Sequence, residues 1–528
     1  MRPAKQAGLK NSSTAIQTAP LPALASAYAD FMAGRASASL EACEQLVAAD
    51  SPDRDRALVL QARALIRLNR AADAVALLAA GVAEITDPLV RIEAEVRLAV
   101  AYATLNDFAS AEAYLASLKS PEAIDAPLEW RSEMANTEAL IAWMRGDLTA
   151  ADEALTRARL DKSSLARGRN HIMEAWVEAR RGNFANHARQ LLEGADQLQT
   201  ADVLDVAVLA PAARAISNMA REISMPGLLR KASELHSNLA WTDDLAVEEF
   251  NSARTLGWAL ALQGSERYFE SLRLLHRASS IAPTSGWRVW ALLDRAAMKR
   301  YAGELASSSA DLYEALELAN KISWGETSDE ERTGLLYAAE LTAAVNTGEA
   351  SSLLARFGQI HESFSTRMAL RGDARLDAGR AYSTGVVQQA LGDVRKAKHF
   401  YESAYFTYDE IGYAWRAART ALHLYEVTRD ASWHELAREK IRDYPQSWIA
   451  ADVRSASTGV ADEGWNRLTP RQREVFTALS EVMTAKRIAD RLDCSPNTVR
   501  NHIHWIYQAF RVQSQPELIT EARKRQLL

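Results

Sequence analysis

Apolar residues recur at helical spacing along most of the chain, and short turns interrupt them at intervals. The helical stretches are rich in Ala and Leu, which favour helix, and each ends in a small turn residue that an acid often follows. Their spacing is roughly 36 to 45 residues, with one gap of about twice that after Gly182. We expect stacked helical hairpins, because one hairpin cannot bury its apolar face and a stack can. The predicted turns are Asn106-Asp107, Gly146-Asp147, Gly182-Asn183, Gly264, Gly303-Glu304, Gly348-Glu349 and Gly392-Asp393.

The clearest repeat lies at residues 378–406. Gly385 would allow two helices to approach closely, Gly392 permits the turn, and small and large residues alternate on the second helix at Ala397, Tyr401 and Ala404. This spacing resembles the tetratricopeptide repeat, and residues 21–450 resemble the degenerate, MalT-like tetratricopeptide (TPR) arrays. The resemblance implies an α-solenoid. A second unit repeats the same offsets at Ala139, Gly146, Ala151, Leu155 and Ala158.

Tryptophan is frequent, with 13 residues, and several fall on the first helices of the expected hairpins. First helices usually line the concave face of such superhelices, so these side chains could form an aromatic ligand surface. Trp at helical spacing also fills gaps between repeats, and we favour that interpretation. The residues concerned are Trp143, Trp176, Trp258 and Trp290.

The two ends of the expected solenoid are polar. Residues 1–20 are interpreted as a flexible tail, and residues 451–465, which are small and polar with two glycines, as a linker. No apolar run is long enough for a signal peptide or a membrane span, so we expect a cytoplasmic protein without a membrane partner. Cys43 and Cys494 lie far apart and indicate neither a disulfide framework nor a metal site.

The charge is unevenly distributed. The net charge is −6, yet the residues from Asn466 onward contain 11 Lys and Arg against 6 Asp and Glu, so this segment carries +5 and the remainder −11. A small basic module attached to a large acidic body suits DNA binding by the module. It also suits a merely solvated basic surface.

Residues 466–528 carry the start signals of four helices. Thr469 would cap the first with Gln472 in the capping-box position, and Thr484 would cap a short second helix. Ser495 would cap the third and Ser514 the fourth, where Glu517 takes the capping-box position. The second and third helices therefore predict a helix-turn-helix with a short turn.

The third helix has two faces. Four apolar residues at helical spacing should face the core: Val499, Ile503, Ile506 and Phe510. The opposite face carries residue types that pair with base edges, Arg with guanine and Asn with adenine. Any exposed helix face is polar, however, so the spacing alone leaves DNA reading open. The candidate base-reading residues are Asn497, Arg500, Asn501 and His504.

The whole of residues 466–528 resembles the LuxR/FixJ-type helix-turn-helix. The matching segments are LTPRQREV, Lys486-Arg487-Ile488-Ala489, Cys494-Ser495 and Thr498-Val499-Arg500, together with His502, Ile506 and Val512. The resemblance implies sequence-specific DNA binding by a bacterial transcription regulator. The chain departs from the family pattern at Val482 and Arg511, where glycine is usual, and at Ala485, where asparagine is frequent.

By this resemblance, Arg500 occupies the family's recognition-helix Lys position and should reach a base edge or a phosphate. Ser495 and Thr498, at the start of the third helix, would meet phosphate, helped by the helix N-terminus, and Lys486 would also lie near phosphate. His502 is interpreted as packing beside the core, and Cys494 as a buried small hydrophobe.

The leading hypothesis is a one-component regulator whose solenoid senses a peptide, a protein or a small molecule. RNA polymerase and a second copy of the chain, paired through the fourth helix, are candidate partners. The alternative is a TPR scaffold or adaptor whose helix-turn-helix contacts protein rather than DNA. The sequence has no GxxxxGK(S/T) phosphate loop, HExxH, GxSxG or GxGxxG motif, so we expect no enzyme and no cofactor.

Overall fold

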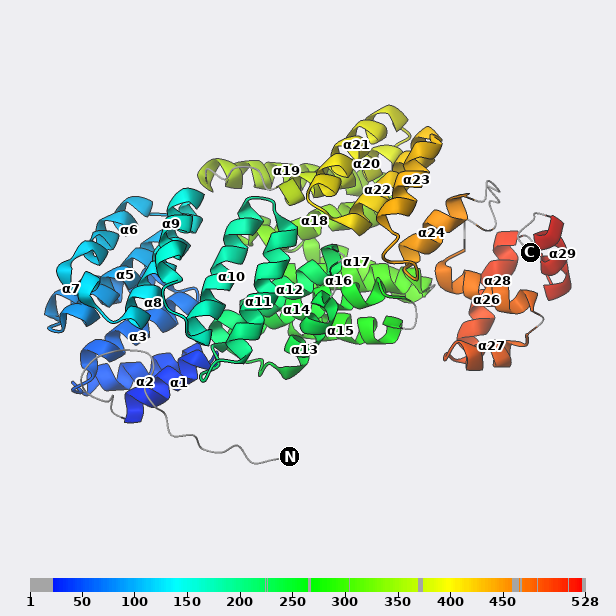
Figure 1. Cartoon of the computed structure of the whole chain (residues 1–528). Helices are drawn as coiled ribbons and strands as arrows, with labels where there is room; N and C mark the ends of the chain where they lie inside the picture. The colour runs from blue at the N-terminus through cyan, green and yellow to red at the C-terminus, as the bar shows by residue number, and fades with distance from the viewer. Residues whose placement is uncertain are drawn as a thin grey trace. The chain divides into compact units, whose positions relative to one another are not determined.

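The computed structural model describes residues 22–223, 225, 227–264, 267–302, 304–368, 374–457, 465, 468–481, 483–510 and 512–524 (Figure 1). All of the regular elements in these ranges are helical, so the all-α class predicted from the sequence is confirmed. None of the helices in the described part combines the length and the apolar character that a membrane span requires. The expected tail at residues 1–20 lies outside these ranges.

The chain divides into two compact units. Unit 1 comprises the residues up to Ile216 together with Glu234–Glu248, and unit 2 comprises Ser217–Ser233 and the residues from Glu249 onward. The passages between the units fall within α12 (Val206–Glu222), α13 (Leu228–Asn238) and α14 (Ala246–Ala261). The preceding helices of unit 1 are α1 (Pro22–Met32), α2 (Ala36–Ala48), α3 (Arg54–Arg67), α4 (Ala71–Gly81), α5 (Pro88–Thr104), α6 (Phe108–Leu115), α7 (Pro121–Asp125), α8 (Leu128–Arg145), α9 (Leu148–Ala158), α10 (Ser164–Arg180) and α11 (Phe184–Gln199).

Unit 2 continues with the same kind of antiparallel helix pairs. Helix α24 runs to Ser457, so helical structure continues beyond residue 450, where the repeats were expected to end. The helices of unit 2 that precede its C-terminal domain are α15 (Tyr268–Ile281), α16 (Ser285–Tyr301), α17 (Leu305–Ala319), α18 (Asp329–Thr342), α19 (Thr347–Met368), α20 (Ala374–Ala390), α21 (Val394–Glu410), α22 (Ala414–Thr428), α23 (Ala431–Lys440) and α24 (Trp448–Ser457).

Local chemistry forms the hairpin turns. Between α8 and α9, Gly146 adopts a left-handed φ of 85°, which L residues with side chains rarely adopt, and ends α8. The Asp147 carboxylate then accepts a hydrogen bond of 3.0 Å from the Ala150 amide and caps α9. The same arrangement recurs at Asn106-Asp107, Gly182-Asn183 and Gly392-Asp393, so these predicted turns are confirmed.

Two of the predicted turns need comment. The turn expected at Gly348-Glu349 is wrong, because Gly348 lies in the first turn of α19. The chain turns at residues 343–346 instead, where the Asn346 side chain accepts a hydrogen bond of 3.1 Å from the Glu349 amide. The double gap after Gly182 holds a further turn at Gly227, which has a φ of 91°. Gly303 lies outside the described residues.

The first helices of successive hairpins in unit 1 pack side by side, in the order α3, α5, α8 and α10. The second repeat unit shows how the pattern fills the core. Ala139 on α8 is fully buried, as are Ala151 and Ala158 on α9, and Leu155 is 1% exposed. Small residues therefore allow the helices to approach, and the large residue fills the space between them.

The repeat in α20 and α21 has the close contact that its glycine predicted. A Cβ atom on Gly385 would lie 2.6 Å from Cδ1 of Tyr401, whose side chain is fully buried. We expect Gly385→Ala to destabilise unit 2 by about 1–3 kcal/mol, because the packed ring has no room to retreat. Thermal unfolding of the full chain would measure the effect.

Gly379 on the same helix provides a matched control. Its added Cβ atom would meet only ordinary contacts, the nearest being the Tyr408 hydroxyl at 3.7 Å. Gly379→Ala should therefore stabilise the helix by roughly 0.5–1 kcal/mol, from helix propensity alone. Equal effects of the two substitutions would contradict the close-approach explanation.

An aromatic cluster fills the interior of unit 2. Trp258 of α14 stacks on Trp415 of α22, with ring centroids 5.7 Å apart, and lies 6.4 Å from Trp448 of α24. Tyr301 of α16 stacks on Trp448. These four residues, the inner aromatic cluster, join helices from distant parts of unit 2. Trp258 is 3% exposed and packs in the interior, as favoured over an open ligand surface, whereas Trp143, Trp176 and Trp290 are only partly buried.

Candidate DNA-binding interface

The C-terminal domain begins with a helix whose cap matches the sequence prediction. In α26 (Pro470–Ser480), the Thr469 hydroxyl accepts a hydrogen bond of 3.2 Å from the Gln472 amide. The Gln472 side chain in turn accepts a hydrogen bond of 2.8 Å from the Thr469 amide. This reciprocal capping box satisfies two donors that the helix itself leaves free, and it fixes where the helix begins.

The next two helices form a helix-turn-helix. Helix α27 (Ala485–Arg491) starts at Thr484, whose hydroxyl accepts a hydrogen bond from the Arg487 amide. The turn then reverses at Asp493, which has a left-handed φ of 48°, and the Cys494 amide donates to the Ala489 carbonyl at 3.0 Å. Helix α28 (Pro496–Phe510) follows directly, and it packs on both α26 and α27.

The apolar face of α28 lies in the core of this domain. Val499, Ile506 and Phe510 are buried as predicted, whereas Ile503 is only partly buried against the same core. Phe510 stacks on Phe476 of α26 with ring centroids 5.2 Å apart. The buried residues therefore fix the rotation of α28 about its axis, and with it the side chains that α28 presents outward.

The fourth helix packs on its own domain. Helix α29 (Gln515–Lys524) is capped by Ser514, whose hydroxyl accepts from the Glu517 amide, while the Glu517 carboxylate accepts from the Gln513 amide. Leu518 and Ala522 are buried in the domain core. These two residues are therefore not available for pairing with a second copy of the chain. Ile519, which also lies on α29, is only partly buried.

All four predicted base-reading residues are exposed on one side of α28. We call Asn497, Arg500, Asn501 and His504 the recognition face. Within it, Arg500 Nη1 donates to Asn497 Oδ1 at 3.3 Å. Because neither side chain is buried, this hydrogen bond can exchange for one to a ligand at little cost.

The predicted phosphate contacts differ in their availability. Ser495 is the N-cap residue, and its hydroxyl is engaged by the Thr498 amide at 3.0 Å and the Thr498 hydroxyl at 2.8 Å. Pro496 has no amide hydrogen, and the Val499 amide donates to the Ser495 carbonyl. Among the amides of this first turn, that of Asn497 is left for an anion. Lys486 is exposed at the start of α27.

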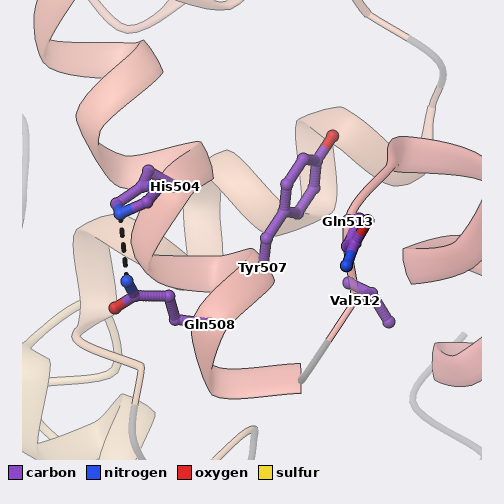
Figure 2. A pocket seen from close by; sticks show the side chains of 5 residues that line it. All are labelled: His504, Tyr507, Gln508, Val512 and Gln513. Carbon is purple, nitrogen blue, oxygen red and sulfur yellow. Dashed lines mark hydrogen bonds between the residues drawn. The ribbon is translucent and has the colours of Figure 1, made fainter.

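A hollow of about 450 Å³ lies beside the C-terminal half of α28. It is lined by His504, Tyr507, Gln508, Val512 and Gln513, and Figure 2 shows His504 joined to Gln508. The two side-chain nitrogens, both named Nε2, are 3.0 Å apart. An amide nitrogen can only donate, so in this orientation of the Gln508 amide the Nε2 atom of His504 is the acceptor. In a neutral imidazole the proton is then on Nδ1.

Three exposed residues near the recognition face were not assigned from the sequence. Gln508 continues the helical spacing of Asn501 and His504, which is the signal that could have identified it. Arg487 follows Lys486 in the first turn of α27 and is exposed, so a second cation stands there. Trp505 is 49% exposed, beside the recognition face.

His502 packs in the domain core, as predicted, with 4% of its surface exposed. Burial, together with the nearby positive charge of Arg471, lowers the pKa of His502 from 6.5 to about 4. Arg471 itself is held by Glu474 at 2.6 Å and donates to the Leu492 carbonyl in the turn. The imidazole is therefore neutral in the folded domain at neutral pH.

This shifted pKa predicts acid sensitivity of the domain. Below pH 6.5 the unfolded chain binds a proton at His502, whereas the folded domain does not until about pH 4. The stability contributed by neutral His502 is thus present above pH 6.5 and is lost as the pH falls toward 4, amounting to about 3 kcal/mol. Hydrogen–deuterium exchange of the α28 amides, corrected for intrinsic rates, would report this loss. His502→Phe should remove the dependence and His504→Phe should leave it, and an unchanged wild-type protection across this range would contradict the assignment.

The departures from the family pattern are only partly described. Val482 and Arg511 lie outside the described residues, while Ala485 begins α27 without disturbing its cap at Thr484. Cys494 packs against the domain core, but it is only partly buried rather than buried as predicted.

Comparison with known proteins identifies the class of this domain. Residues 466–522 match the family described as bacterial regulatory proteins, luxR family, so the C-terminal domain is a LuxR-family helix-turn-helix domain. Among curated proteins, the chain is similar to HTH-type transcriptional regulators Mb0914c of Mycobacterium bovis and Rv0890c of Mycobacterium tuberculosis. Each match is 30% identical over 95 residues and covers 16% of this chain but only 11% of the relative.

Two solved structures align over most of the chain at low similarity. One is the APC/C hetero-tetramer Cut9-Hcn1, with 14% identity, a TM-score of 0.28 and coverage of 94% of this chain and 95% of that one. The other is Naa15/Naa10 bound to HypK-THB. The latter has 13% identity, a TM-score of 0.22 and coverage of 96% and 80%.

Proposed function

We propose that this protein is a sequence-specific DNA-binding transcription regulator, with its helical-repeat part acting as the sensor of a signal. The observation that carries the proposal is the recognition face. Its four side chains project from one side of a helix whose other side is fixed in the core of a LuxR-family domain.

The residue types on this face suit base edges in the major groove. The Arg500 guanidinium can donate two parallel hydrogen bonds to O6 and N7 of guanine, and the Asn501 amide can pair with N6 and N7 of adenine. His504, with its proton on Nδ1, can donate to an acceptor such as guanine N7. Only one turn of α28 separates these groups, so they would read neighbouring base pairs.

Charge at the start of α27 supports a phosphate contact. Lys486 and Arg487 lie in the first turn, where the positive end of the helix dipole makes cations unfavourable. A DNA phosphate placed there would interact favourably with both side chains. Arg491, by contrast, is already paired with Glu481 at 2.5 Å.

The test is selection of sheared genomic DNA by the purified full-length chain, followed by sequencing. We expect enrichment of a limited set of fragments that share a motif, because base contacts distinguish sites and phosphate contacts do not. Recovery of DNA without a shared motif would contradict sequence-specific regulation. Recovery of none would instead favour a scaffold whose helix-turn-helix contacts protein.

A further inference from the structure

Unit 1 contains a cavity of about 250 Å³ that none of the preceding argument uses. It opens between the N-terminal halves of α8 and α10, and residues 200–203, which follow α11, close one side. Most of the lining residues have side chains with a hydroxyl, an amide or a charge, although apolar atoms make up the larger part of the exposed lining. Such a cavity with convergent polar groups is typical of a small-molecule site.

A network of charged residues forms the floor of this cavity. Glu133 of α8 is held by three arginines, with Arg97 Nη2 at 2.9 Å, Arg63 Nη2 at 3.3 Å and Arg169 Nη1 at 3.5 Å. Burial alone would raise the pKa of Glu133, but the three guanidinium groups lower it well below its usual value. Glu133 is therefore a permanent carboxylate.

The charges of this network cancel within the protein. Arg169 also donates through Nε to Asp205 at 2.8 Å, and Glu93 lies 3.3 Å from Arg97 and 3.6 Å from Arg63. Three guanidinium groups thus face three carboxylates. Arg169 lines the cavity, yet its positive charge is already balanced, so the floor has no surplus cation to bind an anionic ligand.

The rim of the cavity carries three further carboxylates: Glu129, Asp161 and Asp202. None of them has an ion-pair partner in the described part of the chain. Asp161 is the most constrained, with 7% of its surface exposed, and its Oδ1 accepts a hydrogen bond of 2.8 Å from the Ser163 amide. These three carboxylates therefore add negative charge to the lining of the cavity.

An amide on the wall is fixed so that its oxygen is available as an acceptor. Asn136 Nδ2 donates to Asn170 Oδ1 at 2.8 Å, and Asn170 Nδ2 donates to the Ala158 carbonyl at 3.0 Å. These hydrogen bonds set the orientation of Asn136 without using its side-chain oxygen. Wall and rim together offer hydrogen-bond acceptors and negative charge, which is complementary to an ammonium group with several N–H donors.

We propose that this cavity binds an alkylammonium group, either that of a small free amine or that of a lysine side chain. The ammonium would lie between the rim carboxylates and donate to Asn136, and its carbon chain would extend into the cavity. This site would give the proposed sensor a class of ligand. The inference rests on the proposed function only in so far as ammonium binding would alter DNA binding.

The experiment is isothermal titration calorimetry of the full-length chain without DNA, using spermidine and a capped lysine tripeptide as separate ligands. The test variant is Glu129→Gln/Asp161→Asn/Asp202→Asn, which removes three charges while the asparagine at 161 can still accept from the Ser163 amide. We expect the dissociation constant to rise at least about tenfold in this variant. The matched control, Glu41→Gln/Glu44→Gln/Asp125→Asn, removes the same charge from exposed positions of unit 1 and should leave binding nearly unchanged.

The two ligands distinguish the sources of the ammonium group. Binding of spermidine that is sensitive to the rim variant supports a free amine, and binding of the tripeptide alone supports a partner protein. The proposal is overturned if neither ligand binds at about 1 mM, if the control weakens binding as much as the test variant, or if Mg²⁺ competes equally well as a bare charge. Because DNA is absent from the titration, a failure here leaves the proposed DNA binding to its own test.

Discussion

The double substitution Arg500→Ala/Asn501→Ala is expected to abolish sequence-specific DNA binding while the domain remains folded. Both side chains are exposed, so their removal leaves the core of the domain intact. Each bidentate pair with a base contributes about 1–3 kcal/mol of discrimination. Affinity for a selected site should therefore fall by about two orders of magnitude or more. Fluorescence anisotropy with a labelled duplex at fixed salt would measure it.

Lys486→Ala is the matched control for this prediction, because its proposed partner is a phosphate. We expect it to weaken binding to all sequences by a similar factor and to reduce the salt dependence by about one phosphate contact. The ratio of specific to non-specific affinity should stay close to that of the wild type. Wild-type discrimination by the Arg500/Asn501 variant would show that the recognition face does not read bases.

The second large effect concerns the interior of unit 2. Glu222 is fully buried and accepts hydrogen bonds from Arg416, with Nε at 2.7 Å and Nη2 at 2.9 Å, and it also pairs with Arg221. Despite the burial, the two arginines keep the pKa of Glu222 far below its usual value. We expect Glu222→Gln to cost about 3–5 kcal/mol, because it leaves buried guanidinium charge without a counter-charge. Denaturant unfolding followed by tryptophan fluorescence would measure the loss.

A second substitution separates charge imbalance from lost packing. In the Glu222→Gln background, Arg416→Met removes one of the two cations that Glu222 balanced, and it keeps a long apolar side chain against Trp415, over which the Arg416 guanidinium lies at 4.6 Å. Much of the lost stability should return, since paired removal of buried charges is often neutral. If the double variant is less stable by the sum of the two single effects, the charge argument fails.

Local signals made the hairpins and the C-terminal domain predictable. A glycine or asparagine that accepts a left-handed φ, followed by a capping side chain, fixes a turn within a few residues, as at Gly146 and Asp147. The capping box at Thr469 works in the same way. The prediction at Gly348 was wrong because the cap is supplied by Asn346, two residues earlier, and a glycine is also tolerated inside the first turn of a helix.

The charged interior could not be derived in the same way, since its partners lie in different hairpins. A carboxylate in one first helix gives no local indication of which arginine it will meet. The separations nevertheless follow the repeat: Arg97 and Glu133 are 36 residues apart, as are Arg169 and Asp205, and Arg254 and Asp294 are 40 apart. Opposite charges one repeat apart are thus a signal in the sequence for these ion pairs.

In the C-terminal domain, spacing and resemblance located the exposed face of α28 but not the pairings within it. The contact of His504 with Gln508 depends on side-chain rotamers, which a pattern of residue types does not specify. The same holds for Ser495, where the sequence indicates a cap and a phosphate ligand equally well. The structure shows its hydroxyl engaged in capping.

The inner aromatic cluster limits how the number of repeats in unit 2 can change during evolution. In an open array each hairpin contacts only its neighbours, so hairpins can be duplicated or deleted with little effect on the others. Here Trp258 stacks on Trp415 across the intervening hairpins. Insertion or loss of one hairpin between them would separate these rings and leave large apolar surfaces without a partner. We therefore expect related chains that keep both tryptophans to vary in length outside this interval rather than within it.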